Sequence, residues 1–203
     1  MFFKRIIWPV CILICLGTTA ANAGARTTQH SKHLMKIRDS QRYKVKTPKS
    51  SIQAGAARVT VRASAKTVQK TVLKFNRYSK WIHRFKKSKI VGKSGGKTDV
   101  YLEVPILKGL AKVWAVVRFD PPKHLGKDDV VIKGHLIKGN VKFLDVNWRI
   151  TRLDDNNTQL DLSLLIVPDI PAPGSIVTGE VAYAADVAVI GIRERSEKIT
   201  RKK

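Results

Sequence analysis

The chain has 203 residues, with 39 lysines and arginines against 15 aspartates and glutamates, so its formal net charge at pH 7 is +24. Its two cysteines, Cys11 and Cys15, both lie in the first apolar segment, which excludes a disulfide framework, a thiolate nucleophile or a cysteine-ligated metal in the rest of the chain. The positive charge would attract anionic lipid head groups, nucleic acid or acidic proteins, and more weakly as salt is added. Solubility alone is the alternative explanation of the charge.

The first 23 residues have the three parts of a secretory signal peptide. Lys4 and Arg5 supply the positive charge, residues 6–16 form the apolar segment, and residues 21–23 are small enough for a cleavage site. A membrane anchor would need about 20 consecutive apolar residues, and a lipoprotein signal would need small residues before Cys15. We therefore expect export, with cleavage after Ala23, to a bacterial periplasm.

Residues 24–57 form the next segment, which carries eight basic residues and one acidic residue, Asp39. It has few large apolar residues and no long hydrophobic period. Segments of this composition cannot bury enough apolar surface to fold alone. We expect a basic, flexible tail here and a folded domain over residues 58–203.

The folded domain is predicted to begin with a strand at residues 58–62, where apolar and polar residues alternate. A helix follows Ser64, which is a favourable N-cap residue. Lys66, Lys70 and Lys74 fall on the side of this helix opposite its apolar stripe, where they form either a solvated face or a surface for an anionic partner. The stripe itself recurs at helical spacing and consists of Ala65, Val68, Val72 and Phe75.

Residues 76–92 combine aromatic and basic side chains, and they are predicted to form the end of a short helix, a turn and the first long strand of a curved sheet. Tyr78, Trp81 and Phe85 suggest a cover over an apolar interior, whereas the cations suggest an anionic partner, and both interpretations can hold together. No Asp or Glu occurs between Ser40 and Thr98. The cations of the turn are Arg77, Lys80, Arg84, Lys86, Lys87 and Lys89.

The remaining chain is predicted to be a series of strands followed by one long helix. The intervals between the strands are those of antiparallel hairpins, without the strand–helix alternation of a parallel sheet. The helix, over residues 175–200, is rich in Ala, Gly and Val, so it can lie close against the sheet. The strands are predicted at residues 98–106, 110–119, 129–137, 141–153 and 158–167.

This order of elements resembles the START-like (SRPBCC) superfamily, and within it the polyketide cyclase/coenzyme Q-binding branch. The resemblance covers residues 58–198 and implies an α+β helix-grip fold, in which a curved antiparallel sheet wraps around a long C-terminal helix. The residues that carry it lie at 61–65, 75–81, 146–150 and 158–160, and in the dipeptides Val167-Pro168 and Ile170-Pro171.

The resemblance also implies a cavity between the sheet and the C-terminal helix that takes a lipid, quinone or polyketide. Ordinary core packing is the alternative role for each aromatic residue, and a one-residue shift of a strand would reverse its assignment to the cavity. The residues expected by position to line the cavity are Trp81, Phe85, Tyr101, Trp114, His135, Trp148 and Tyr183.

No recognisable catalytic motif is present in the sequence. His135, Glu103 and Asp186 could meet as acid and base, as in the cyclase-like relatives, but we assign no catalytic residue, no cofactor and no metal site.

The hypothesis we favour is an exported, non-enzymatic protein that holds an apolar small molecule or lipid and docks to an anionic membrane surface. The alternatives are a cyclase or hydrolase that uses the same cavity, and binding of nucleic acid or an acidic protein through the basic face. Nucleic acid is the least favoured partner because export removes most of it from reach. The tail and a basic surface would make the membrane contact, and that surface consists of Lys66, Lys70, Lys74, Lys80, Arg84, Lys86 and Lys87.

Overall fold

The structure, a computed structural model, describes residues 40–47, 50–106, 111–169 and 173–202. All of these belong to one compact unit, Ile37–Lys203. The expected signal peptide and residues 24–39 of the expected tail lie outside the described residues. The elements are β1 (Gln41–Thr47), β2 (Ser50–Val61), α2 (Ala65–Val72), a 3-10 turn η1 (Phe75–Arg77), α3 (Tyr78–Trp81), β3 (Lys87–Ser94), β4 (Lys97–Ile106), β5 (Ala111–Phe119), β6 (Lys123–His124), β7 (Asp129–Gly139), β8 (Val141–Arg152), β9 (Thr158–Pro168) and α4 (Gly174–Thr200).

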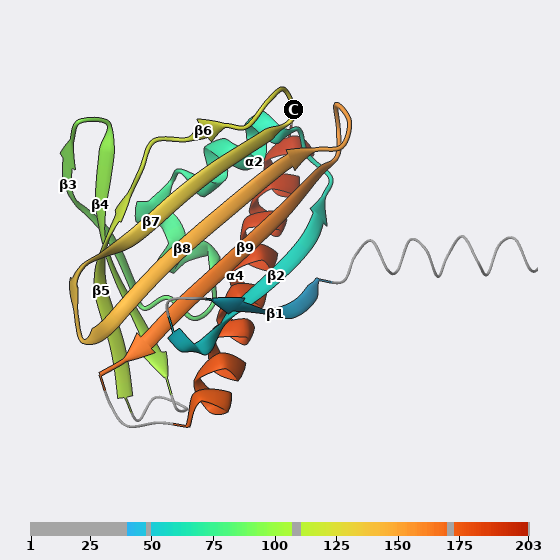
Figure 1. Cartoon of the computed structure of the whole chain (residues 1–203). Coiled ribbons are helices and arrows are strands. Elements are labelled where there is room, and N and C mark those ends of the chain that lie inside the picture. The colour runs from blue at the N-terminus through green and yellow to red at the C-terminus, as the bar shows by residue number, and fades with distance from the viewer. Residues whose placement is uncertain (1–39, 48–49, 107–110, 170–172, 203) are drawn as a thin grey trace, which may run out of the picture. The chain divides into compact units, whose positions relative to one another are not determined.

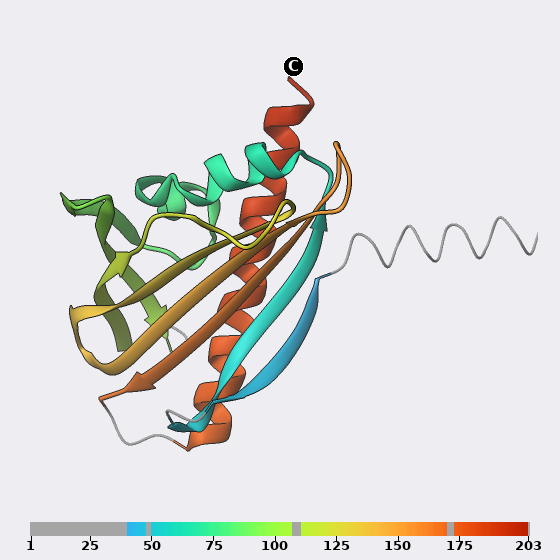
Figure 2. The ribbon, with the colours of Figure 1, turned by 45° about the horizontal axis from the view of Figure 1, so that its top comes forward.

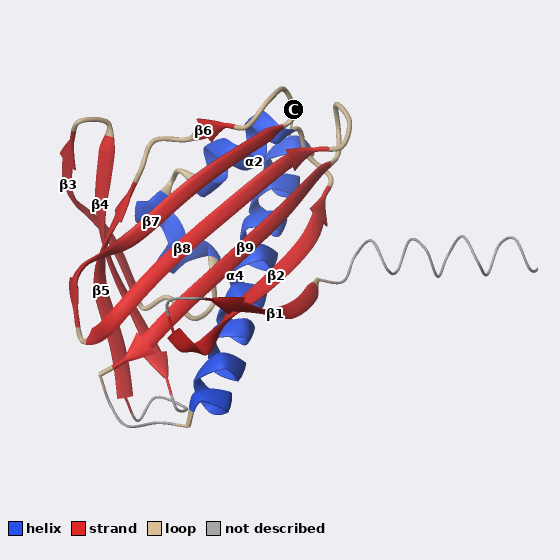
Figure 3. Cartoon of the chain, viewed as in Figure 1, coloured by secondary structure: helices blue, strands red, loops and turns tan. Residues whose placement is uncertain are grey.

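Nine strands form one antiparallel sheet in the order β1-β2-β9-β8-β7-β5-β4-β3, with β6 paired to β7 (Figures 1 and 3). Most strands pair with a neighbour along the chain, but β5 pairs with β7, and β2 closes onto β9, where Val59 lies opposite Leu160. The first and last parts of the domain are therefore joined within the sheet. The predicted α+β class with an antiparallel sheet is confirmed.

The sheet begins earlier in the chain than the sequence indicated. The described part of the segment expected to be a tail forms β1 and the first half of β2, which pair with each other from Gln41 opposite Arg58 to Thr47 opposite Ser50. Ala54, Gly55, Ala56 and Ala57 are all buried. Their sequence predicts a strand only weakly, because these side chains carry little apolar surface. Small side chains are nevertheless required here, because α4 packs directly on this part of β2.

Helix α4 lies across the sheet and packs most extensively on β2 (Figures 1 and 2). A Cβ atom at Gly55 would stand 2.2 Å from the backbone nitrogen of Ala182, so only glycine permits this approach. Among the described residues α4 alone is long and apolar enough to cross a membrane, but half of its apolar window is buried in the fold. Its packing is that of a core helix, and its observed start at Gly174 is one residue before the predicted one.

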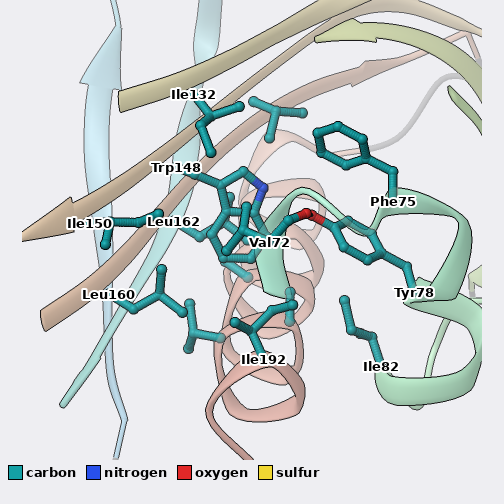
Figure 4. Packing of buried hydrophobic residues seen from close by; sticks show 14 of the residues in the cluster. Val72, Phe75, Tyr78, Ile82, Ile132, Trp148, Ile150, Leu160, Leu162 and Ile192 are labelled. Atoms are coloured by element: carbon teal, nitrogen blue, oxygen red, sulfur yellow. The ribbon is translucent and has the colours of Figure 1, made fainter. Parts of the chain in front are cut away.

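The segment α2–η1–α3 covers a further part of the sheet. Ser64 caps α2 as predicted, because its side chain accepts a hydrogen bond from the Thr67 amide. Val68 and Val72 are fully buried, so the apolar stripe packs inward while the lysines of α2 face solvent. Figure 4 shows where this helical segment, α4 and the sheet meet, at Val72, Phe75, Tyr78, Ile82, Ile132, Trp148, Ile150, Leu160, Leu162 and Ile192.

Candidate functional site

An apolar cavity of about 160 Å³ lies between the sheet and the first half of α4. The strands supply one wall because alternate residues of each strand face the same side. Val100 lies opposite Val117, Leu102 opposite Ala115, and Val146 opposite Leu164, so apolar side chains meet across each pair. The wall contributed by the strands consists of Leu102, Val104, Val113, Ala115, Val117, Phe119, Leu144, Val146, Trp148, Leu162, Leu164, Ile166 and Pro168.

Helix α4 supplies the opposite wall at helical spacing. The residues that line the cavity lie between Ile176 and Ala188, which places the cavity in the first half of the helix. Ile176 is 53% exposed although it lines the cavity, so the opening lies beside the first turns of α4. The helical wall consists of Ile176, Val177, Glu180, Val181, Ala184 and Ala188.

Aromatic residues from α3, from the loop after it and from β8 pack together in the cavity wall. The Tyr78 ring lies edge-on to both Phe85 and Trp148, with centroids 5.8 and 6.4 Å away. The Tyr78 hydroxyl donates to the carbonyl of Val72 at 2.7 Å, and burial raises the pKa of Tyr78 above its usual range. Tyr78 is therefore a neutral structural donor at physiological pH. The indole nitrogen of Trp148 is buried and has no hydrogen-bond partner among the described residues.

Of the residues that the structure describes, two with charged side chains line the cavity, both at its opening. Arg84 comes from the loop between α3 and β3, and its Nη1 donates to Oε2 of Glu180 on α4 at 3.1 Å. The Arg84 Nη2 donates to the carbonyl of Pro105 at 3.2 Å. One guanidinium thus connects the loop, the end of β4 and α4 across the opening.

Of the seven residues expected to line the cavity, Phe85 and Trp148 do so. Tyr101 and Trp114 stack on each other on the opposite face of the sheet, with ring centroids 6.1 Å apart. Their neighbours along β4 and β5, Leu102, Val113 and Ala115, line the cavity instead. His135 faces away too, because it pairs in register with Arg118, whose side chain contacts Asp99. The assignment of Tyr101, Trp114 and His135 to the cavity was shifted by one residue along the strands, which put them on the wrong face of the sheet.

The other two expected residues lie outside the cavity wall and contact arginines. The Arg195 guanidinium lies 5.1 Å from the centre of the Trp81 ring. Tyr183 is exposed on α4 between Arg84 and Arg42, whose guanidinium carbons lie 5.0 and 5.9 Å from the ring centre. Each ring holds a guanidinium by a cation–π contact, which contributes about 0.5–1 kcal/mol at an exposed site.

The candidate acid–base residues do not come together, and none of His135, Glu103 and Asp186 lines the cavity. Glu103 accepts a hydrogen bond from the Tyr101 hydroxyl at 2.9 Å, which lowers the pKa of its carboxyl group. Asp186 is buried against β1, where it accepts from Ser40 Oγ and lies 3.4 Å from Arg42. Among all the described residues, no group of three or more His, Cys, Asp or Glu side chains could hold a metal ion.

The seven cations expected on the basic surface fall into separate places. Lys66, Lys70 and Lys74 line a hollow beside α2 and Ile199, near the end of α4. Ile199 is eleven residues past Ala188, about 16 Å along a helix. Arg84 lines the cavity opening, Lys86 precedes β3, and Lys87 begins β3 and lies 3.4 Å from Glu103. Lys80 lies on α3, between the two groups in the chain.

Sequence patterns could have located most of the wall. On β4 the apolar residues Val100, Leu102 and Val104 alternate with polar ones, and on β5 Lys112 and Arg118 mark the outer face. The large aromatic residues outweighed this alternation. Nothing in the sequence connects Glu180 with Arg84, so this pair could not be predicted.

A curved antiparallel sheet that grips a long C-terminal helix around an apolar cavity is the START-like, helix-grip architecture, as the resemblance implied. Residues 61–180, more than half of the chain, match the model of the family described as polyketide cyclase/dehydrase and lipid transport, and the chain belongs to this family. A search of curated proteins finds no significant match.

Solved structures share the fold at low sequence identity. A STAR-related lipid transfer protein from Xanthomonas axonopodis has a TM-score of 0.67 and 13% identity, over 77% of this chain and 93% of that one. Human StAR-related lipid transfer protein 5 has a TM-score of 0.65 and 10% identity, over 88% and 97% of the two chains. The Zhui aromatase/cyclase from a Streptomyces species has a TM-score of 0.54 and 20% identity, over 72% and 94%. These likenesses concern the fold.

Proposed function

We propose that this protein is an exported, non-enzymatic binding protein that holds an apolar or amphipathic molecule in its cavity. The observation that carries the proposal is the wall of the cavity, where Arg84 and Glu180 are the only charged side chains among the described residues. Binding by such a site depends on removal of apolar surface from water, at about 25 cal/mol per Å². The lipid transport named in the family description, and in two of the similar structures, supports this class of ligand.

The arrangement of ionisable groups favours binding over catalysis. Arg84 and Glu180 pair with each other, and the third ionisable group of the wall, Tyr78, stays protonated because burial raises its pKa. General acid–base chemistry needs a group that exchanges a proton near neutral pH. An enzyme that uses the same cavity, as the name of the aromatase/cyclase suggests for that protein, remains the alternative for the experiment to test.

Native mass spectrometry of the full protein from its own host tests the ligand and the export together. We expect the periplasmic fraction to contain a chain that lacks residues 1–23, with a molecule of lipid, quinone or polyketide class released in stoichiometric amount by solvent extraction. An empty protein bound to nucleic acid or an acidic protein would contradict the cavity function. An uncleaved chain in the cytoplasm would contradict export alone.

We further propose that the basic surface beside the opening docks the protein to an anionic membrane. Lys86 and Lys87 follow Arg84 closely in the chain and are exposed, and Ile176, which lines the cavity together with Arg84, offers an exposed apolar side chain. Each Lys near an anionic surface contributes on the order of 1 kcal/mol. The lysines of α2 lie beyond the far end of the cavity, so docking through them alone would leave the opening away from the bilayer.

Replacement of both Lys86 and Lys87 by glutamine should weaken binding to vesicles that contain phosphatidylglycerol by roughly 30-fold, from about 1 kcal/mol lost per lysine. Co-sedimentation measures this binding, which should also fall as salt is added. The triple replacement Lys66→Gln, Lys70→Gln, Lys74→Gln is the control and should have the smaller effect despite removing more charge. A larger effect of the triple variant would place the membrane contact on α2, and equal binding to phosphatidylcholine vesicles would contradict electrostatic docking.

A further inference from the structure

The charged pair at the cavity opening is asymmetric. The Arg84 side chain is 17% exposed and has three contacts, to Glu180, to the Pro105 carbonyl and to the Tyr183 ring. The Glu180 side chain is 45% exposed, and within the described parts of the chain its one ion pair is with Arg84. Arg84 is thus held by α4 and by the end of β4, and its contacts with the Pro105 carbonyl and the Tyr183 ring remain when Glu180 leaves.

The position of the pair matters as much as its contacts. Both residues line the cavity, so a molecule that lies inside with one end at the opening places that end against Arg84. Arg84 has five N–H donors, and the described residues supply acceptors for two of them, Glu180 Oε2 and the Pro105 carbonyl. A planar guanidinium binds a carboxylate or phosphate through two parallel hydrogen bonds. An incoming acidic group can therefore take the place of the Glu180 carboxylate.

The local excess of positive charge favours an anion as well. Lys86 and Lys87 follow Arg84 closely in the chain, and Lys112 lies on the outer face of β5 opposite Pro105, whose carbonyl Arg84 contacts. The carboxylate of Glu103, on the same outer face, is already matched by Lys87 at 3.4 Å. These lysines lie outside the cavity wall, but their field attracts an acidic head group and repels a cationic one.

The size of the cavity limits the apolar part of the ligand. A volume of about 160 Å³ corresponds to roughly ten to fifteen water-sized positions, at about 10–15 Å³ each. That space suits one alkyl chain or one small ring system better than the two chains of a phospholipid.

We propose that the ligand is a single-chain amphiphile with one acidic head group, a carboxylate or a phosphate, and that Arg84 binds this group at the opening in exchange for Glu180. The inference rests on the proposed cavity function and narrows it to a ligand class. The apolar chain supplies affinity and Arg84 supplies selectivity for the charged end.

Fluorescence titration of the full chain with cis-parinaric acid and with cis-parinaryl alcohol tests the inference, because the two probes share the chain and differ in the head group. We expect the acid to bind about tenfold more tightly than the alcohol, which corresponds to roughly 1.4 kcal/mol from the charged hydrogen bonds. Arg84→Gln should bring the ratio of the two affinities close to one, and Glu180→Gln should increase it. Arg77→Gln, at an exposed arginine of η1, is the matched control and should keep the parent ratio.

The outcomes separate the two proposals. Binding of the alcohol as tightly as the acid by the parent protein would overturn the acidic head group and leave the cavity function standing. Failure of both probes to bind would overturn the cavity function and this inference with it. If Arg84→Gln does not fold, Glu180→Gln still decides, since a ratio that falls or stays constant contradicts the exchange. Competition by oleate and by oleoyl lysophosphatidic acid then shows whether carboxylate or phosphate is preferred, and displacement by neither would overturn the inference.

Discussion

Gly55→Ala should lower the free energy of unfolding by about 3 kcal/mol, at the upper end of the usual range for overpacking a core. The added Cβ would stand 2.2 Å from the nitrogen and 2.5 Å from the Cα of Ala182, and 2.6 Å from the carbonyl carbon of Val181. All three atoms belong to the backbone of α4, so no side chain can rotate away and the helix itself must move. Thermal unfolding followed by circular dichroism should show a midpoint lower by roughly 6–12 °C.

Gly179→Ala is the matched control on α4. A Cβ at this position meets nothing within 4 Å, so the substitution should raise the free energy of unfolding by about 0.5–1 kcal/mol through the helix propensity of alanine. The same chemical change therefore has opposite signs at the two positions. A midpoint for Gly55→Ala within about 2 °C of the parent, less than 1 kcal/mol for a chain of this size, would show that α4 does not lie this close to β2.

Gly55 also shows where prediction from the sequence failed. The long helix and the strands from residue 98 onward could be predicted, because their apolar periods are strong and their turns contain Gly, Pro and Asn. β1 and the start of β2 could not, because Ala54, Gly55, Ala56 and Ala57 show no apolar alternation. The reason these residues are small is α4, more than 120 residues later in the chain, so no local signal reveals it.

An apolar cavity wall was predicted from the sequence, but only some of the residues that form it were. Trp148 was assigned to it, and its partners in register, Ile132 and Leu162, share its face as antiparallel pairing requires. Tyr101 and Trp114 were assigned to the wrong face because a large aromatic residue was given more weight than the alternation around it. The Arg84–Glu180 pair joins residues 96 positions apart, and only the folded sheet brings the loop after α3 to the second turn of α4.

The class of ligand has to be inferred from the residues that line the cavity. The family match and the solved structures at 10–20% identity support the fold, but they do not identify the ligand. The informative features of this chain are the two charged residues that the described part of its apolar cavity wall carries, Arg84 and Glu180. Selectivity is therefore expected to depend on Arg84, and affinity on the space that the wall encloses.

Filling that space should abolish binding while the fold is retained. Ala184 faces the cavity from α4 and Val113 faces it from β5 on the opposite wall. Tryptophan at either position would occupy volume that the ligand needs. If it excludes about four methylene groups, the loss at about 0.8 kcal/mol each is roughly 3 kcal/mol, so the Kd for cis-parinaryl alcohol should rise by about 100-fold. This neutral probe keeps the measurement independent of Arg84.

Stability distinguishes a filled cavity from a disrupted core. An indole placed in empty space gains contacts, so Ala184→Trp and Val113→Trp should unfold at or above the parent temperature, whereas overpacking would lower it. Asn147→Trp is the control, because Asn147 is exposed on β8 between two wall residues, Val146 and Trp148, and faces the other side of the sheet. It should bind the probe as the parent does. Tight binding by both stable cavity variants would mean that the ligand lies elsewhere, since two large side chains from opposite walls cannot both leave the same space open.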